Sequence, residues 1–236
     1  GRSNSNPAFI RALAKYFFEQ GEAVAAQMKA VKVLHSKAEN LPVENLFAAV
    51  NWDLKLQGVV NPFVGELLTK GGNVGLRQVG LEVNFQLRRP EVQKFLDDYT
   101  LKLAGEVNKT TLNAVKDQIS TGLESGESIP EIRSRVQDVF ANSSKARAES
   151  IARSETSRAQ MAGQVQGYKQ SGVVEGIAPL VSADACEFCQ AIAEEFRNGI
   201  GLEDDFFKLG DVIHGTNGGE MKVNYTNIKH PPFHPQ

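Results

Sequence analysis

Apolar residues recur at three- and four-residue steps over most of the chain up to Gly172, and this spacing predicts a series of amphipathic helices. The first stripe runs from residue 7 to about residue 40, and Pro7 suits its first turn because the proline ring already fixes φ near the helical value. A second helix is predicted over 43–57, after which the Gly- and Pro-containing segment 58–62 interrupts the pattern.

A glycine cluster between Gly71 and Gly75 follows a predicted short helix over 63–70. Its spacing matches neither the P-loop nor the dinucleotide-binding fingerprint. Because glycine gives the backbone unusual conformational freedom, we interpret the cluster as a plain loop that acts as a flexible hinge. Residues 81–87 then alternate apolar and polar side chains, which predicts an extended segment.

Three further helices are predicted before Gly172, joined by short turns. The first runs from residue 91 to about residue 123 and carries a long apolar stripe. Ser128 and Glu131 have the spacing of a capping box, so the next helix is expected to begin there. The third follows the turn at 142–144 and ends at Gly172, a glycine placed where helices commonly terminate.

Beyond Val173 the pattern changes to short apolar pieces that alternate with glycine and asparagine turns, which predicts a small β-containing cap. The chain is therefore expected to have three segments: a helical region with the glycine-rich hinge over 1–89, a helical layer over 90–172, and the cap over 173–236. The predicted fold class is α+β, predominantly α, with an elongated helical body and a small C-terminal α+β cap. A core as thin as that of the cap commonly needs a staple, and structural zinc is one way to supply it.

The last predicted helix carries small side chains at its inward positions. Such residues let two backbones approach closely, so we expect this helix to pack tightly against another helix or a partner chain. The small inward residues are Ala146, Ala148, Ala152, Ala159, Ala162 and Gly163.

The same helix has a local excess of positive charge. A contact with DNA phosphates is one interpretation, and a solvated helix face with charges paired at i,i+4 spacing is the other. The residues concerned are Lys145, Arg147, Arg153 and Arg158. Glu155 is expected to form a buried ion pair with an arginine, holding this helix against the cap.

The overall composition is that of an ordinary soluble protein. Apolar residues make up 41% and charged residues 23% of the 236 positions, and the formal net charge is -2. Any contact with nucleic acid must therefore come from a local patch rather than from global charge. No apolar run approaches the roughly 20 residues that span a bilayer, so no membrane partner is expected.

The two cysteines and two of the histidines suggest a metal site. Cys186 and Cys189 form a Cys-x-x-Cys pair, which brings two thiols within reach of one tetrahedral metal, and His230 and His234 supply a His-x3-His pair downstream. We expect these four residues to hold a structural zinc ion. A reduced thiol pair and a redox-active pair are the alternatives, although a thioredoxin-type pair would open a helix after a strand of a βαβ unit. Glycine-flanked His214 is a weaker candidate ligand.

An ordered set of short motifs carries a family resemblance. In sequence order the motifs are Ile151-Ala-Arg-Ser-Glu155, Gly167-Tyr168, Ser171-Gly-Val173, Asp184-x-Cys186-x-x-Cys189, Phe206 or Phe207, and Pro231-Pro-Phe-His-Pro235. This succession resembles the phage Mu F-like minor head proteins, found in many tailed phages beside the portal gene. The resemblance is strongest from Thr110 to Gln236.

The resemblance implies a virion component rather than an enzyme. It implies a minor capsid protein of low copy number, located in the capsid interior or at the portal vertex, and in the host cytoplasm during assembly. Its expected partners are the portal protein and the major capsid protein, with packaged DNA as a further contact of the basic helix. The family pattern continues past His-Pro with a Cys-x-Cys, so the resemblance also implies metal ligands other than His230 and His234.

An enzymatic function is the alternative. The Cys/His cluster would serve a zinc-dependent hydrolase or nuclease if one coordination position stayed open. A toxin-like activity is suggested by the run Arg153-Ser-Glu155, since some Mu F-like proteins are fused to ADP-ribosyltransferases. Those enzymes place the arginine and the glutamate on separate strands, so residues packed in one helical turn do not fit that chemistry.

Overall fold

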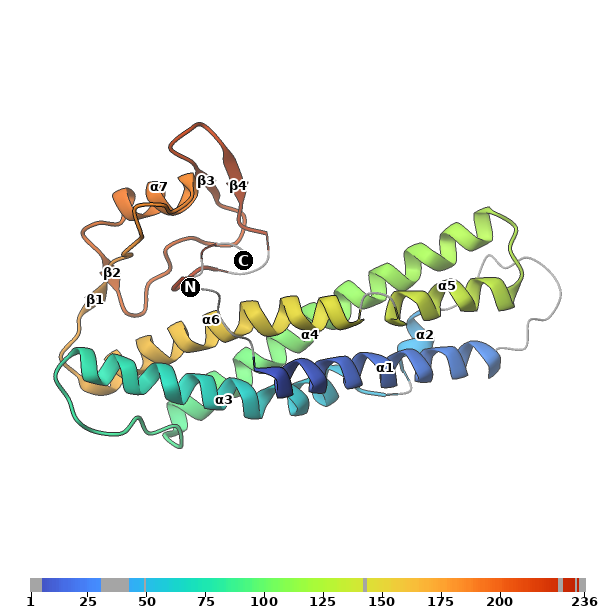
Figure 1. Cartoon of the computed structure of the whole chain (residues 1–236), viewed down its shortest axis with the longest axis horizontal. Coiled ribbons are helices and arrows are strands. Elements are labelled where there is room, and N and C mark those ends of the chain that lie inside the picture. Colours follow the sequence, from blue (N-terminus) through green and yellow to red (C-terminus); the bar gives the residue numbers. More distant parts are fainter. Residues whose placement is uncertain are drawn as a thin grey trace. The chain divides into compact units, whose positions relative to one another are not determined.

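The structure, a computed structural model, describes residues 6–30, 43–48, 50–141, 144–224, 227–231 and 233. These residues are predominantly helical, with short strands near the C-terminus (Figure 1). The elements are α1 (Pro7–Ala30), α2 (Val43–Ala48), α3 (Trp52–Gln78), α4 (Pro90–Glu124), α5 (Ile129–Ala141), α6 (Ser144–Ser171), β1 (Gly176–Ile177), α7 (Glu187–Glu195), β2 (Ile200–Gly201), β3 (Val212–His214) and β4 (Glu220–Lys222). The predicted α+β, predominantly α fold class is confirmed. Over the described part of the chain, no helix is long and apolar enough to cross a membrane.

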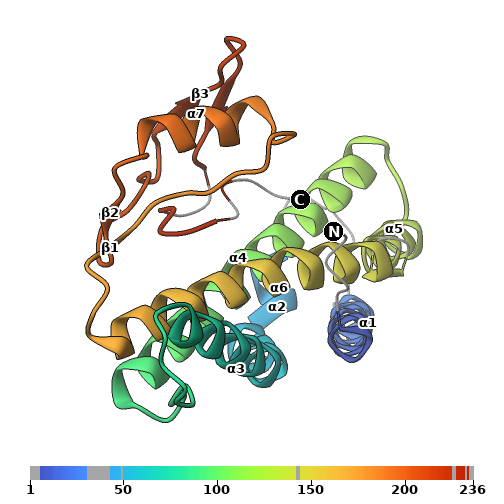
Figure 2. The ribbon, with the colours of Figure 1, turned by 60° about the vertical axis from the view of Figure 1, so that its left-hand side comes forward.

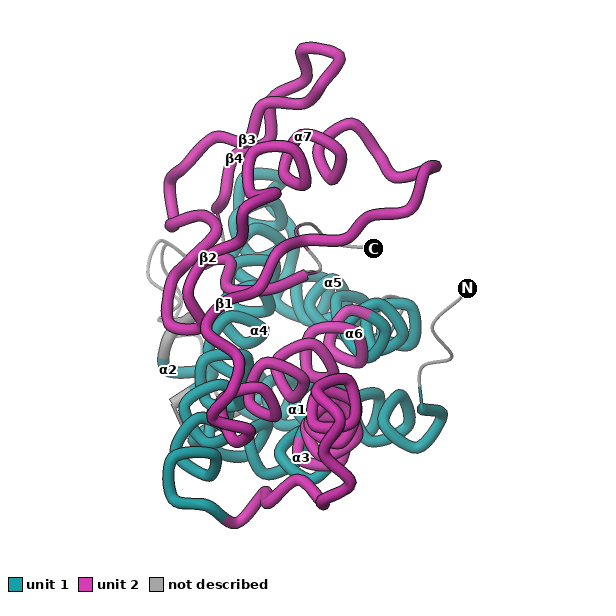
Figure 3. Tube along the Cα trace, turned by 90° about the vertical axis from the view of Figure 1, so that its left-hand side faces the viewer, with its two compact units in different colours: residues 1–64, 89–153 teal, residues 65–88, 154–236 magenta. Residues whose placement is uncertain are grey.

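The chain divides into two compact units, each assembled from two separate stretches of sequence (Figure 3). Unit 1 contains residues 1–64 and 89–153, and unit 2 contains residues 65–88 and 154–236. The boundaries fall inside α3 and inside α6, so each of these helices contributes to both units. The three segments predicted from the sequence, 1–89, 90–172 and 173–236, are each one continuous stretch. The pattern of apolar residues along a helix does not show that two compact units share that helix.

Unit 1 is built from helices whose apolar faces meet in a common core. α5 contacts α1 and α4, and α2 contacts the same two helices. Each fully buried aliphatic or aromatic side chain in such a core contributes about 1.5–3 kcal/mol relative to exposure. The buried members of this core are Val24, Met28, Leu46, Val115, Ile119, Ile132, Val136 and Phe140.

The predicted capping signals are confirmed. The backbone N–H and the hydroxyl of Ser128 both donate to Glu131 Oε2, at 2.7 and 2.6 Å, at the start of α5. Gly172 follows the last residue of α6 with a φ of 68°, a left-handed conformation that glycine adopts without steric cost. These local interactions explain why the sequence pattern located the ends of α5 and α6.

The helix predicted over 43–57 is wrong, because two helices cover this stretch. α3 begins at Trp52, where Asn51 Oδ1 accepts a hydrogen bond from the backbone N–H of Leu54 at 3.1 Å. Asparagine in this position satisfies a backbone donor that the first turn leaves without a partner. A new helix therefore starts at Asn51 rather than continuing from α2.

The predicted break at 58–62 and the hinge at Gly71–Gly75 are also wrong. α3 continues through both, with Pro62 and the whole glycine cluster inside the helix. A proline ring in a helix clashes with the carbonyl four residues earlier, which here belongs to Gly58. The local signals for a break are overridden by the packing of the C-terminal half of α3.

The glycines of α3 and α6 let the two backbones touch within unit 2. A Cβ atom at Gly71 would clash with the carbonyl oxygen of Gln160, and one at Gly75 would lie 2.5 Å from the carbonyl oxygen of Gln164. The relation is reciprocal, because Cβ atoms at Gly163 and Gly167 of α6 would clash with carbonyl oxygens of α3. The expected tight packing of α6 against another helix is therefore confirmed at Gly163, which with Gly167 meets the α3 backbone at Leu68 and Gly72. The inward position predicted for Ala146 is wrong, because this residue is exposed on the outer side of α6.

The C-terminal part of unit 2 has a core of its own. Figure 2 shows α7 beside β3, which it contacts, and β3 pairs with β4 as an antiparallel hairpin. Phe196 packs edge-on against Phe206 and Phe207, with ring centroids 5.1 and 5.3 Å apart. The buried members of the core are Ile192, Phe206, Phe207, Ile213, Val223, Ile228 and Phe233. These residues are spread over positions 192–233 and meet in the fold, and the need for a metal staple stays a prediction.

We predict opposite effects for the same substitution at two glycines of α3. Gly71→Ala should lower the free energy of unfolding by about 1–3 kcal/mol, because the added methyl group overpacks the contact with the α6 backbone. Gly58→Ala should raise it by about 0.5–1 kcal/mol, because nothing lies within 4 Å of the new Cβ and alanine favours the helix. Urea unfolding followed by circular dichroism measures both, and equal effects at the two sites would contradict the packing described for Gly71.

Candidate functional site

Cys186 and Cys189 lie together at the N-terminus of α7. Cys186 is the N-cap residue, with an extended backbone and no capping hydrogen bond from its side chain, and Cys189 is the third helical residue. Cys186 is exposed, whereas Cys189 is half-buried against the aromatic core. Burial, together with a hydrogen bond and electrostatic interaction with Cys186, raises the pKa of Cys189 to about 11.

Glu187, the first of the two residues between the cysteines, attaches this turn to the β3–β4 hairpin. Glu187 Oε2 accepts backbone hydrogen bonds from Asn217 at 3.1 Å and from Gly219 at 3.4 Å. The Glu187 carbonyl oxygen also accepts a hydrogen bond from the backbone N–H of Thr216 at 3.4 Å. Side chains are absent at Gly215 and Gly219, where a Cβ atom would collide with the Glu187 carboxylate. The start of α7 and the tip of the hairpin therefore form one hydrogen-bonded joint.

The predicted histidine ligands do not join this pair among the described residues. The half-buried side chain of His230 lines a pocket beside α6, and its Nδ1 lies 2.8 Å from the carbonyl oxygen of Pro231. Because a carbonyl can only accept, Nδ1 carries the proton and Nε2 keeps its lone pair. His214 is 70% exposed, with its Nδ1 3.5 Å from Glu220 Oε1. His234 lies outside the described residues.

These positions do not by themselves make a zinc site. Structural zinc is held by four ligands at the corners of a tetrahedron, and the described residues bring together only the two thiols. Over the part of the chain that the structure describes, no group of three or more His, Cys, Asp or Glu side chains is placed to hold a metal ion. The predicted zinc site therefore stays a prediction that depends on His234 and on a different position for His230.

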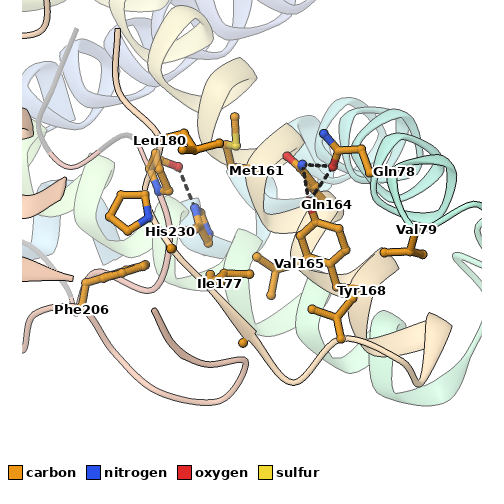
Figure 4. A pocket seen from close by; sticks show the side chains of 15 residues that line it. Gln78, Val79, Met161, Gln164, Val165, Tyr168, Ile177, Leu180, Phe206 and His230 are labelled. Atoms are coloured by element: carbon orange, nitrogen blue, oxygen red, sulfur yellow. Dashed lines mark hydrogen bonds between the residues drawn. The ribbon is translucent and has the colours of Figure 1, made fainter. Parts of the chain in front are cut away.

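The pocket next to His230 lies within unit 2 and has a volume of about 450 Å³ (Figure 4). One wall is apolar, with Met161, Ile177 and Phe206. The opposite wall is polar, and there Tyr168 Oη donates a hydrogen bond to Gln78 Oε1 at 2.5 Å. Among the described residues that line it there is no carboxylate, cation or nucleophilic serine or cysteine. The pocket can accept an apolar group, but it does not assemble a catalytic acid, base and nucleophile.

The expected buried ion pair of Glu155 is confirmed, and its partner is Arg158 of the same helix; that the pair holds α6 against the cap stays a prediction. Arg158 Nη1 lies 2.9 Å from Glu155 Oε1, one helical turn away, and the Glu155 side chain is only 3% exposed. The charge of Arg158 also contributes to lowering the pKa of His230, after the larger effect of burial. The pair therefore belongs to the interior of unit 2.

The basic residues of α6 divide into internal and exposed groups. The Arg147 guanidinium donates to Thr111 Oγ1 and to the Val107 carbonyl oxygen, both at 2.8 Å, and lies over the ring of Phe17 at 4.8 Å. These contacts tie the first part of α6 to α4 and α1 inside unit 1. Lys145 and Arg153 are exposed. Of the four residues predicted to touch DNA, only these two are therefore exposed, and the other two are half-buried.

Sequence reasoning missed a buried polar network in unit 1. Tyr16 Oη donates to Asn108 Oδ1 at 2.6 Å, and Gln20 Nε2 donates to the same oxygen at 3.1 Å. Asn108 Nδ2 donates in turn to Asp53 Oδ1 at 2.8 Å. Burial raises the pKa of Tyr16, so the phenol stays protonated and keeps donating. The sequence did contain a signal for this network. Gln20 and Asn108 are polar residues at positions that belong to the apolar stripes of α1 and α4.

Comparisons with known proteins add little about function. No protein-family model matches the chain, and no solved structure matches it. The chain is similar to the uncharacterized protein YqbB of Bacillus subtilis (strain 168), with 26% identity over 132 residues. The matched stretch is 56% of this chain and 43% of YqbB, so the chain spans less than half the length of that relative.

We predict that the polar network of unit 1 depends most on Asn108. Asn108→Ala should lower the free energy of unfolding by about 2–3 kcal/mol, because Tyr16 and Gln20 both lose their shorter acceptor in a buried site and keep only acceptors at 3.2 Å. Tyr16→Phe should cost about 1 kcal/mol, since Asn108 still accepts from Gln20. Chemical denaturation measures the two variants, and a smaller loss for Asn108→Ala than for Tyr16→Phe would contradict this arrangement.

We also predict a pH dependence that arises from His230. Burial lowers the pKa of the folded imidazole below its usual 6.5, so the unfolded chain binds the proton more readily. The stability from neutral His230 should be complete above pH 6.5 and be lost as the pH falls from there through the folded pKa. Thermal unfolding between pH 8 and pH 5 should show this loss in the wild type and in His214→Gln, and a weaker loss in His230→Gln. The same pH profile in His230→Gln as in the wild type would refute the prediction.

Proposed function

We propose that this protein is a minor head protein of a tailed phage, a structural virion component that works near the portal and assists head assembly, genome packaging or ejection. The observation that carries the proposal is the ordered series of Mu F-like motifs between Ile151 and Pro235. Each motif is weak alone, and their common order is what gives the series its specificity. The chain belongs in the capsid interior or at the portal vertex, with the portal protein and the major capsid protein as partners.

The proposed role requires stable surfaces rather than turnover. Two observations support it within unit 2: the backbone contact between α3 and α6 leaves little freedom for sliding, and the C-terminal region packs on its own aromatic core. Among the described residues that line the pocket there is no carboxylate and no serine or cysteine nucleophile. These features suit a part that is assembled once and then keeps its shape.

Copurification tests the proposal. A tagged full-length chain, coexpressed with the portal and major capsid proteins of its own phage, should retain the portal protein through size-exclusion chromatography. It should also be present in purified particles at low copy number. Gly71→Ala should weaken retention if the shape of unit 2 matters, and Gly58→Ala serves as the matched control. Absence of the wild-type chain from purified particles would refute the proposed function.

We predict that any contact with packaged DNA uses Lys145 and Arg153. Because each neutralised phosphate contributes about 0.9 to the slope of log K against log salt, replacing both residues with glutamine should reduce that slope by about 2. Arg158→Gln should leave the slope nearly unchanged, since that guanidinium is paired with Glu155. Fluorescence anisotropy with duplex DNA over a salt series measures the slopes, and an unchanged slope in the Lys145/Arg153 variant would exclude these two residues.

A further inference from the structure

We propose that Cys186 and Cys189 form a redox-active dithiol, which closes to an intrachain disulfide by exchange with a small-molecule disulfide. The proposal is independent of the virion role. In this proposal the two cysteines form a reversible disulfide bond instead of binding a metal ion.

The backbone already holds the two residues at a suitable separation. An N-cap side chain lies next to the third residue of its helix, which is where Cys189 stands relative to Cys186. The rise and radius of an α-helix place Cα atoms three positions apart about 5 Å from each other, and the two sulfur atoms are close enough here to share a hydrogen bond. Disulfides join residues with Cα atoms about 4.4–6.8 Å apart, so the bond can form with a small change in side-chain rotamers.

The two thiols differ in access, and this difference assigns their roles. Cys186 is exposed at the positive end of the α7 dipole and makes no capping hydrogen bond that would have to break. Cys189 is half-buried on the core formed by α7 and the hairpin. Cys186 is therefore the attacking sulfur, and Cys189 is the resolving sulfur that an external disulfide reaches less easily.

The exchange balances with a low-molecular-weight disulfide, RSSR, as the oxidant. The Cys186 thiolate attacks one sulfur of RSSR, forming a Cys186–S–R bond and releasing RS⁻, which takes up the proton that Cys186 lost. The Cys189 thiol, as its thiolate, then attacks Cys186 Sγ and releases the second RS⁻, which takes up the proton from Cys189. Two protein thiols are oxidised and one RSSR is reduced to two RSH.

The acidic residue between the two cysteines is engaged elsewhere. The Glu187 carboxylate accepts the backbone N–H groups of Asn217 and Gly219. Two sulfur atoms can close on each other by themselves, whereas a structural zinc ion needs four donors.

The joint at Glu187 connects the redox state to the hairpin. Closing the disulfide draws Cys186 toward Cys189 and so changes the turn between them. Glu187 lies in this turn and holds the tip of the β3–β4 hairpin by its hydrogen bonds. The oxidised and reduced forms should therefore differ in amide exchange at 215–219, a segment that contains neither cysteine.

The 236-residue chain suits a direct test because its sequence has two cysteines. Wild-type protein, freed of metal with a chelator, is equilibrated with mixtures of reduced and oxidised glutathione, and its thiols are counted by maleimide labelling and intact mass. We expect both thiols to be lost together as the oxidised fraction rises, with no glutathione retained. Cys189→Ser should retain one glutathione, and Cys186→Ser should react far more slowly.

Two results would overturn the proposal, and both come from the wild-type protein even if a variant fails to fold. One is glutathione retained on the wild-type chain without ring closure. The other is binding of one zinc ion per chain that protects both thiols from maleimide in the presence of a competing chelator. The second result would instead establish the predicted metal site.

Discussion

Contact between the backbones of α3 and α6 is the constraint on which unit 2 depends. Gly71 and Gly75 on one helix and Gly163 and Gly167 on the other are each four residues apart, so each pair lies on one helix face. Side chains at the contact normally keep helix axes 8–10 Å apart. Because glycine has no side chain, the backbone atoms of the two helices come into direct contact here. Because both faces consist of main chain, there is no flexible side chain to move aside, and a single added methyl group must displace a helix.

This contact also explains how a glycine cluster persists inside one long helix. Gly and Pro cost a helix about 1 and 3 kcal/mol relative to alanine, so α3 is a poor helix when considered alone. The stability of its C-terminal half comes from the surface that it buries against α6 and from Phe85, whose ring occupies the space left by Gly72. Tertiary packing therefore decides the secondary structure here, and local propensity does not.

The C-terminal region is held by aromatic packing rather than by an evident staple. Phe206 meets Phe196 and Phe233 edge-on, and Glu187 joins α7 to the hairpin by backbone hydrogen bonds. Cys189 packs against this core, and Cys186 lies beside it at the start of α7.

The sequence predicted features that depend on neighbours within about four positions. These include α4, the capping box at Ser128, the end of α6 at Gly172 and the Glu155 ion pair. It failed at Gly71–Gly75, because glycine serves both flexible loops and close backbone contacts, and only the partner helix distinguishes the two. The separation of His230 from Cys186 and Cys189 could not be predicted either, since spacing along a chain does not fix distance across a fold. The matching four-residue glycine spacings in α3 and α6 were the one signal that could have revealed their pairing.

Hydrogen exchange at the amides of residues 71–76 tests the central claim most directly. If α3 is continuous and packed on α6 through its glycines, these amides should exchange as slowly as those in the middle of α4, because they open only when unit 2 unfolds. Exchange at the rate of an unprotected loop would show that the cluster is a hinge after all, and the account of unit 2 would then be contradicted.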